Sequence, residues 1–149
     1  MKIVVLNEIA KQRSAFGGEL QAPCAPDMVQ KMNIRSQTEL GNDIPDEYLS
    51  FLRATNGVSW NGVSFYGCEE SPISGKEGGK ILDFVDTNLI YRDVESMKNY
   101  LVFGQSDMDI YVFNLSANKY QVLDKISLDE ITSVSTFEEL LVKAFETRL

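Results

Sequence analysis

The residue types that most often carry catalysis are scarce in this sequence. Its 149 residues include no histidine, and its two cysteines, Cys24 and Cys68, stand far apart in the chain. The missing histidine excludes Ser-His-Asp and Cys-His nucleophiles, HExxH zinc sites and the commonest general base near neutral pH. With two isolated cysteines, a structural zinc site also lacks ligands. We therefore expect no catalytic residue, no cofactor and no bound metal.

Asp107-Met108-Asp109 is the acidic pair whose spacing could chelate a divalent cation, as in sugar-nucleotide enzymes. The pair falls between two strand-like runs, where Asp favours turns by hydrogen-bonding its own backbone. We interpret it as a turn with solvated carboxylates. Because Asp and Glu are plentiful, a carboxylate pair for glycoside hydrolysis stays open, although no pair stands out. A metal or carboxylate hydrolase is thus the least favoured function.

The glycine-rich stretch from Gly75 to Lys80 invites comparison with phosphate-binding loops. It has neither the Walker spacing nor the Lys-Ser/Thr ending, and no GxGxxG pattern is present. We interpret it as a loop.

A second set of residues favours protein binding. Trp60 lies shortly before the run that ends in Glu69-Glu70, and aromatic residues beside acids are typical hot spots for a basic partner. For Trp60, a place in the core and a role as an anchor are equally open. The candidate partner-binding residues are Trp60, Glu69, Glu70, Asp107 and Asp109.

Charge is unevenly distributed. The formal net charge is -8. Residues 1–40 contain five basic and four acidic side chains, so the remainder carries a net charge of -9. Such a surface repels nucleic-acid phosphates and speeds association with a basic protein. Acidic surfaces also serve solubility alone. We expect a protein partner with a basic surface and no direct nucleic-acid binding.

The compartment is inferred from the N-terminus and the cysteines. The apolar run Met1–Leu6 stops at Asn7-Glu8, too early for a signal peptide, and no apolar run is long enough to span a membrane. Without an export signal, Cys24 and Cys68 are interpreted as reduced thiols. A cytoplasmic location without membrane contact is expected.

The first part of the chain is predicted to be mostly helical. Met1 to about Ala15 is compatible with a strand or the start of a helix. A helix capped by Asp27 is expected to end near Gly41, with Met28, Met32 and Leu40 on its apolar side. A second helix starts at Asp43-Ile44-Pro45, buries Tyr48, Phe51 and Leu52, and stops at Asn56-Gly57.

Strands dominate the second part. We predict a short strand over Val63–Tyr66, a loop from Ser71 to Gly79, and a helix over Asp86–Glu95 with Leu89, Ile90 and Val94 facing inward. Three strand-like runs follow, and the last two form an antiparallel hairpin; they are Tyr100–Gly104, Asp109–Leu115 and Lys119–Asp124. Thr136 with Glu139 forms a capping box for a final core-facing helix. This order indicates an α+β domain with an antiparallel sheet of about four to six strands.

The segment Glu39–Leu52 contains a Leu-Gly, an Ile-Pro and an aromatic-rich helix, and it is closed by Asn56-Gly57. This combination resembles the signature of the SUKH superfamily. Later segments are similar to the family in order and spacing: Asn88–Tyr91, Leu101–Gly104, Tyr111–Asn114, Tyr120–Asp124 and Ser135–Leu141. The resemblance covers residues 26–149. Asp107-Met108-Asp109 replaces the usual glycine-rich turn, and residues 1–25 match no family segment and have no assigned role.

The resemblance implies a SUKH-type immunity fold as one domain over residues 1–149. Bacterial members of the family are immunity proteins that bind and neutralise toxins, often nucleases or deaminases, and a eukaryotic branch regulates fungal cell-wall assembly. The resemblance implies no catalytic residues. A non-catalytic immunity protein against a basic toxin domain is thus the leading hypothesis, and a regulatory or scaffolding module with a non-toxin partner is the alternative.

Overall fold

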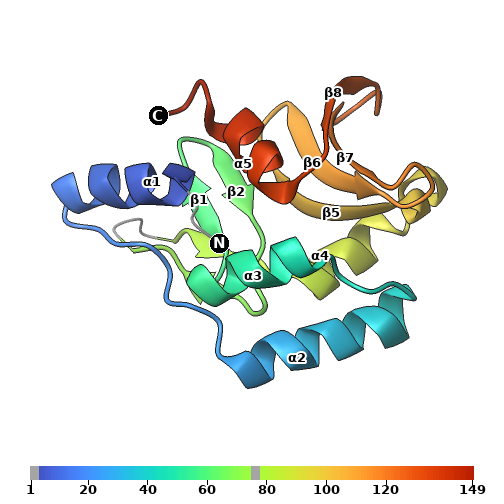
Figure 1. The fold of residues 1–149 in the computed structure, drawn as a ribbon, viewed down its shortest axis with the longest axis horizontal. Helices are drawn as coiled ribbons and strands as arrows, with labels where there is room; N and C mark the ends of the chain where they lie inside the picture. The colour runs from blue at the N-terminus through green and yellow to red at the C-terminus, as the bar shows by residue number, and fades with distance from the viewer. Residues whose placement is uncertain (1–3, 75–77) are drawn as a thin grey trace.

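The fold combines a six-stranded antiparallel sheet with helices packed against it (Figure 1). The computed structural model describes residues 4–74 and 78–149. The helices are α1 (Val4–Ala15), α2 (Pro26–Arg35), η1 (Ser36–Leu40), α3 (Asp46–Ala54), α4 (Phe84–Tyr91), η2 (Glu95–Asn99) and α5 (Phe137–Phe145). The strands are β1 (Val58–Trp60), β2 (Val63–Phe65), β3 (Ser71–Pro72), β4 (Lys80–Ile81), β5 (Tyr100–Gln105), β6 (Asp109–Asn114), β7 (Lys119–Asp124) and β8 (Glu130–Val134). The predicted α+β class is confirmed.

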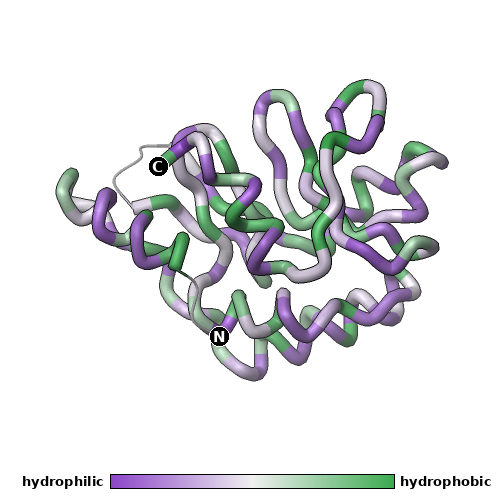
Figure 2. Tube along the Cα trace, turned by 45° about the horizontal axis from the view of Figure 1, so that its top comes forward, coloured by the Kyte–Doolittle hydropathy of each residue, from purple (hydrophilic) through white to green (hydrophobic). Residues whose placement is uncertain are grey.

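The main sheet has the order β1-β2-β5-β6-β7-β8, and β3 pairs with β4 in a separate ribbon. Every neighbouring pair in the main sheet is antiparallel. In Figure 1, α5 and α3 lie against the sheet, α2 lies outside α3, and α1 lies at the β1 end. Along the tube in Figure 2, hydrophobic and hydrophilic residues alternate, as expected for elements with one buried face.

An aromatic cluster joins the helices to the sheet. Tyr48 of α3 lies with its ring centroid 4.6 Å from that of Phe103 in β5 and 5.2 Å from that of Phe137 in α5. All three side chains are fully or almost fully buried. The backbone N–H of Phe137 donates to the Glu47 carboxylate at 2.7 Å, so α3 also caps the start of α5. The helix α3, which the sequence predicted to start at Asp43-Ile44-Pro45, thus positions the C-terminal helix α5.

The Asn56-Gly57 stop joins three segments of the chain. The Oδ1 atom of Asn56 accepts the N–H of Cys68 at 2.8 Å, and Nδ2 donates to the carbonyl oxygen of Glu69 at 3.1 Å. The Asn56 N–H donates to the carbonyl oxygen of Ala22 at 2.8 Å. Gly57 has a φ of 77°, and a Cβ atom there would lie 2.5 Å from the carbonyl oxygen of Phe65. Only glycine fits this position.

The cysteine prediction was wrong. Cys24 and Cys68 form a disulfide across a sequence separation of 44 residues. Both side chains are buried, because the Asn56 bonds bring their two segments against the same core. One of the two arguments for a cytoplasmic location therefore fails, since disulfides persist mainly in oxidising compartments.

The prediction for the helix after the loop was wrong in position and face. The helix α4 starts at Phe84 and ends at Tyr91, and its buried residues are Phe84, Val85 and Asn88. Ile90 is 71% exposed, and Leu89 and Val94 are also exposed. The Asn88 side chain forms the two hydrogen bonds to β5 that the backbone of a neighbouring strand would otherwise form. It accepts the N–H of Val102 at 2.8 Å and donates to the carbonyl oxygen of Val102 at 2.8 Å. A pattern of apolar residues cannot identify a buried polar side chain such as this one.

The predicted loop from Ser71 to Gly79 was wrong at its start, because Ser71–Pro72 forms strand β3 and pairs with β4. The remaining predicted helices and strands are confirmed, most of them with shifted ends. The helix after Pro26 bends into the π-helical turn η1 and stops at Gly41, whose φ is 73°; Ala25, rather than Asp27, is its N-cap. The capping box of α5 is present, with the N–H of Glu139 donating to Thr136 Oγ1 at 3.1 Å. Residues 4–15 form a helix, which settles the alternative between strand and helix there. Residues 1–3 and residues 75–77 of the predicted glycine-rich loop lie outside the described residues.

Replacing both cysteines should lower stability. We expect Cys24→Ser with Cys68→Ser to reduce the free energy of unfolding by about 2–4 kcal/mol, because the crosslink restricts the unfolded chain. Urea unfolding measures the change. A reductant should lower the stability of the wild-type protein to the same level and leave the double variant unchanged. An unchanged free energy of unfolding in the variant would contradict the disulfide.

Removing the side-chain amide of Asn56 should lower stability about as much as removing the disulfide. We expect Asn56→Ala to lower the free energy of unfolding by about 3 kcal/mol, because it leaves the buried N–H of Cys68 and the carbonyl of Glu69 without their partner. Gln37→Ala, which removes one exposed bond to Asp43, is the control and should change it by less than about 0.5 kcal/mol. Equal effects of the two substitutions would contradict this role.

Candidate partner-binding surface

The five predicted contact residues fall into two groups. Asp107 and Asp109 lie at the connection between β5 and β6, and Trp60 ends β1. Glu69 and Glu70 lie beside the ribbon of β3 and β4. The structure therefore does not bring all five residues to one place.

The first group belongs to an acidic end of the main sheet, built from the β5–β6 and β7–β8 connections. The N–H of Asp109 donates to Ser106 Oγ at 3.0 Å, and the N–H of Ser106 donates to the carbonyl oxygen of Asp109 at 2.9 Å. This tight turn leaves Asp107 and Met108 outside the sheet, as predicted for a turn. Met108 is 67% exposed. We call this region the acidic end; its residues are Asp107, Met108, Asp109, Asp124, Ile126 and Asp129.

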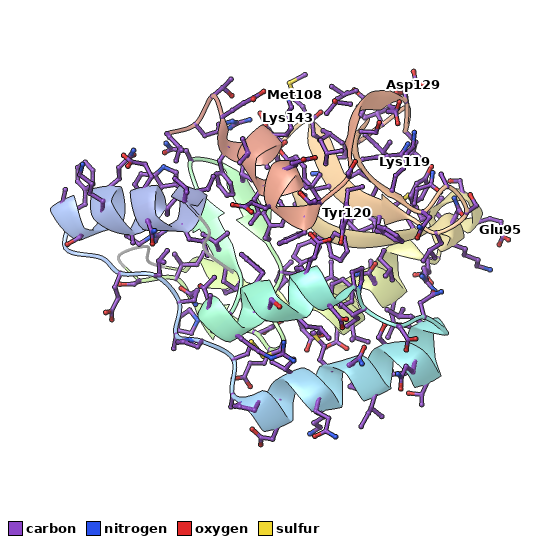
Figure 3. The ribbon with its side chains drawn as sticks, in the orientation of Figure 1. Glu95, Met108, Lys119, Tyr120, Asp129 and Lys143 are labelled. Carbon is purple, nitrogen blue, oxygen red and sulfur yellow. A yellow bond between two sulfur atoms is a disulfide. The ribbon has the colours of Figure 1, made fainter. Side chains whose placement is uncertain are left out.

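Backbone and side-chain bonds hold the two connections together. The N–H of Lys125 donates to the carbonyl oxygen of Met108 at 2.9 Å, and Lys125 Nζ donates to that of Ser106 at 2.9 Å. Ile126 follows at the tip of the second connection and is 94% exposed. Figure 3 shows Met108 and Asp129 on the same side of the molecule, with Asp129 directly before β8 at the base of its connection. Two exposed apolar side chains are thus flanked by carboxylates.

The carboxylates of the acidic end affect one another. Burial raises the pKa of Asp109, and the charges of Asp124 and Asp107 raise it further, while Arg148 opposes them. The N–H groups of Ser127 and Ile126 donate to the Asp124 carboxylate and lower its pKa. Because burial and the neighbouring charges disfavour the ionised form of Asp109, a cation brought close to this end would stabilise that form. The acidic end is therefore suited to a basic partner.

Arg148 connects Trp60's turn to the acidic end. Its guanidinium donates to the carbonyl oxygen of Asn61 at 2.9 Å and lies 3.5 Å from the Asp107 carboxylate. Asn61 and Gly62 form the turn after β1, both with positive φ. Sequence reasoning missed Arg148, because its partners lie far away in the chain.

Trp60 is neither fully buried in the core nor fully exposed as an anchor for a partner. It is partly buried and packs against the core, and the Arg13 guanidinium of α1 lies 5.3 Å above its ring. A cavity of about 290 Å³ adjoins it, lined by residues of α1, of the β1–β2 turn and by Ser74. The helix α1, which had no assigned role, therefore covers Trp60 and reduces its access to a partner.

The second group lies elsewhere. Glu70 forms an ion pair with Lys80 at 3.2 Å. It borders a cavity of about 350 Å³ on the α4 side of the sheet. Glu69 lines another cavity, of about 370 Å³, beneath residues 19–24. Among the described residues, the hydrogen bond of Glu69 goes to Asn56 and the ion pair of Glu70 to Lys80, both away from the acidic end, so their role as contact residues stays a prediction.

Met108 and Ile126 are the apolar contact candidates that sequence reasoning missed. Both carry a weak signal, since each is an apolar residue inside a stretch rich in turn-forming residues. Within residues 4–74 and 78–149, no cluster of three or more His, Cys, Asp or Glu side chains is arranged to hold a metal ion. No helix in the same part of the chain is long and apolar enough to cross a membrane.

Comparison with known proteins identifies the family. No curated protein matches the chain. The family model described as "SMI1 / KNR4 family (SUKH-1)" matches residues 34–142, which is more than half of the chain. The match begins in α2, runs through the aromatic-rich helix, the sheet and the acidic end, and stops in α5; α1 and the segment that follows it lie outside. The chain belongs to the SMI1/KNR4 family (SUKH-1).

Proposed function

We propose that this protein is a non-catalytic immunity protein that neutralises a bacterial toxin domain, of the nuclease or deaminase class, by direct binding. Membership of the SUKH family supports a role in protein binding. The observation that carries the proposal is the acidic end, where Met108 and Ile126 stand exposed among carboxylates.

The chemistry of this end fits a basic protein. Exposed apolar side chains supply area to bury, and the surrounding carboxylates attract and orient a cationic surface. Nucleases bind phosphates with Lys and Arg side chains, so a carboxylate-rich surface competes for the same groups. The toxin's active site would then be covered by the acidic end.

The compartment belongs to the same proposal. An immunity protein that protects the cell producing it acts in the cytoplasm, where thiols are kept reduced. The disulfide between Cys24 and Cys68 is the observation against this location. Alkylation of cells before lysis, followed by mass spectrometry, distinguishes the two: modified cysteines support the cytoplasm, and a protected pair contradicts it.

Co-expression with the toxin-like polypeptide of the neighbouring gene tests the function. We expect the protein to restore growth to cells that produce this toxin domain and to co-purify with it. Full toxicity together with absence of a complex would contradict the proposal. Binding to a neighbouring gene product that is not toxic would instead favour the regulatory alternative.

Neutralising two carboxylates should slow association. We expect Asp107→Asn with Asp109→Asn to lower the association rate constant for an inactivated toxin domain roughly tenfold at low ionic strength, with a weaker effect at high salt. Stopped-flow mixing measures the rate constant.

Glu95→Gln is the matched control, because it removes an exposed carboxylate of η2 that lies away from Met108 and Asp129 in Figure 3. Its rate constant should stay within about twofold of the wild-type value. The control removes one charge and the acidic-end variant removes two, so slowing by the control of about half as much on a logarithmic scale would show that only the net charge matters.

A further inference from the structure

One edge strand of the main sheet is covered by a helix, and the other is not. At one edge, the Arg13 guanidinium of α1 donates to the backbone carbonyl oxygen of Ser59 in β1, so α1 covers that strand. At the other edge, β8 pairs only with β7 within the part of the chain that the structure describes. Figure 1 shows β8 at the far end of the sheet from β1. An uncovered edge strand presents backbone groups that can pair with another chain.

The register identifies a residue whose backbone faces outward. The N–H of Asp124 donates to the carbonyl oxygen of Asp129, so the backbone groups of Asp124 point towards the β8 side. By alternation along β7, those of Gln121 point away from β8, towards β6. Ser133 lies opposite Gln121, so its N–H and C=O point away from β7.

Common protections against strand addition are weak on β8. Its sequence, Glu-Ile-Thr-Ser-Val, contains no proline and no lysine, the residues that most often block an edge. Ile131 is 57% exposed and would supply apolar contact to an added strand. The bulge next to Ile131 limits the stretch that can pair to a few residues.

We propose that the β8 edge accepts an extended strand from a basic partner, adding a seventh strand to the main sheet next to the acidic end. The inference rests on the proposed function and names how the partner docks. Charge selects the occupant: Asp124 ends β7 and Asp129 directly precedes β8, within a part of the chain that carries a net charge of -9. Two copies of this chain, each with a net charge of -8, would repel each other at the same edge.

Strand addition uses main-chain hydrogen bonds, and the acidic end contributes side-chain contacts and steering. The two contributions predict different defects. Loss of carboxylates slows association, whereas loss of an outward N–H speeds dissociation.

Ser133→Pro tests this edge directly. Proline removes the outward N–H without removing a bond to β7, so the sheet is retained. We expect the dissociation rate constant of the complex with the inactivated toxin domain to rise at least tenfold. Ser133→Ala keeps the N–H and is the matched control, with an expected change of less than twofold. Circular dichroism and urea unfolding of both variants check that they fold. An unchanged dissociation rate constant in a folded Ser133→Pro variant would overturn the inference.

Amide hydrogen exchange of the wild-type protein is a second measurement that needs no variant. On binding the toxin domain, the amide of Ser133 should slow its exchange at least tenfold. A complex in which β8 exchange is unchanged overturns strand addition alone. Absence of any complex overturns the proposed function and this inference with it. Slowing that appears without the toxin domain and grows with protein concentration would assign the edge to a second copy of the chain.

Discussion

The side-chain amide of Asn56 is the interaction on which the arrangement of the first half of the molecule depends. It accepts the N–H of Cys68 and donates to the carbonyl of Glu69, while the backbone N–H of Asn56 donates to the carbonyl oxygen of Ala22. The same bonds end α3, direct the chain into β1 and bring the two cysteines together. The next residue, Gly57, must be glycine because the carbonyl oxygen of Phe65 occupies the space of a side chain. Replacing either residue would disturb the edge of the sheet that carries Trp60.

The aromatic cluster connects α3, which ends at this junction, to β5 and α5 in the second half of the molecule. Tyr48 contacts Phe103 and Phe137, and Glu47 caps α5. The sheet is therefore held rigidly by α3 and α5, and its connections at the acidic end project from fixed strands. A binding surface on short, tethered connections loses little conformational entropy when a partner docks. This rigidity, together with the charge, suits the acidic end to fast and specific association.

The elements with strong local signals could be predicted from the sequence. The helix α5 has a cap and a continuous apolar stripe, and β6 and β7 are separated by turn residues. Four short strands, β1, β3, β4 and β8, were missed, because elements of two to five residues carry little periodic signal. In α4, a polar residue faces the interior, so the apolar residues indicated the wrong face. The disulfide and the Arg148 bridge join distant segments, which local patterns do not reveal. Of the predicted contact residues, Asp107 and Asp109 lie together at the acidic end, and Arg148 links Asp107 to Asn61, the residue after Trp60.

The central claim is that the acidic end meets the partner. Carbodiimide labelling of surface carboxylates, read by mass spectrometry with and without the bound toxin domain, tests it most directly. Our account predicts that binding protects Asp107, Asp124 and Asp129 from labelling, while Glu69, Glu70 and Glu95 keep their reactivity. Protection of Glu69 and Glu70 with unchanged labelling of the acidic end would contradict it.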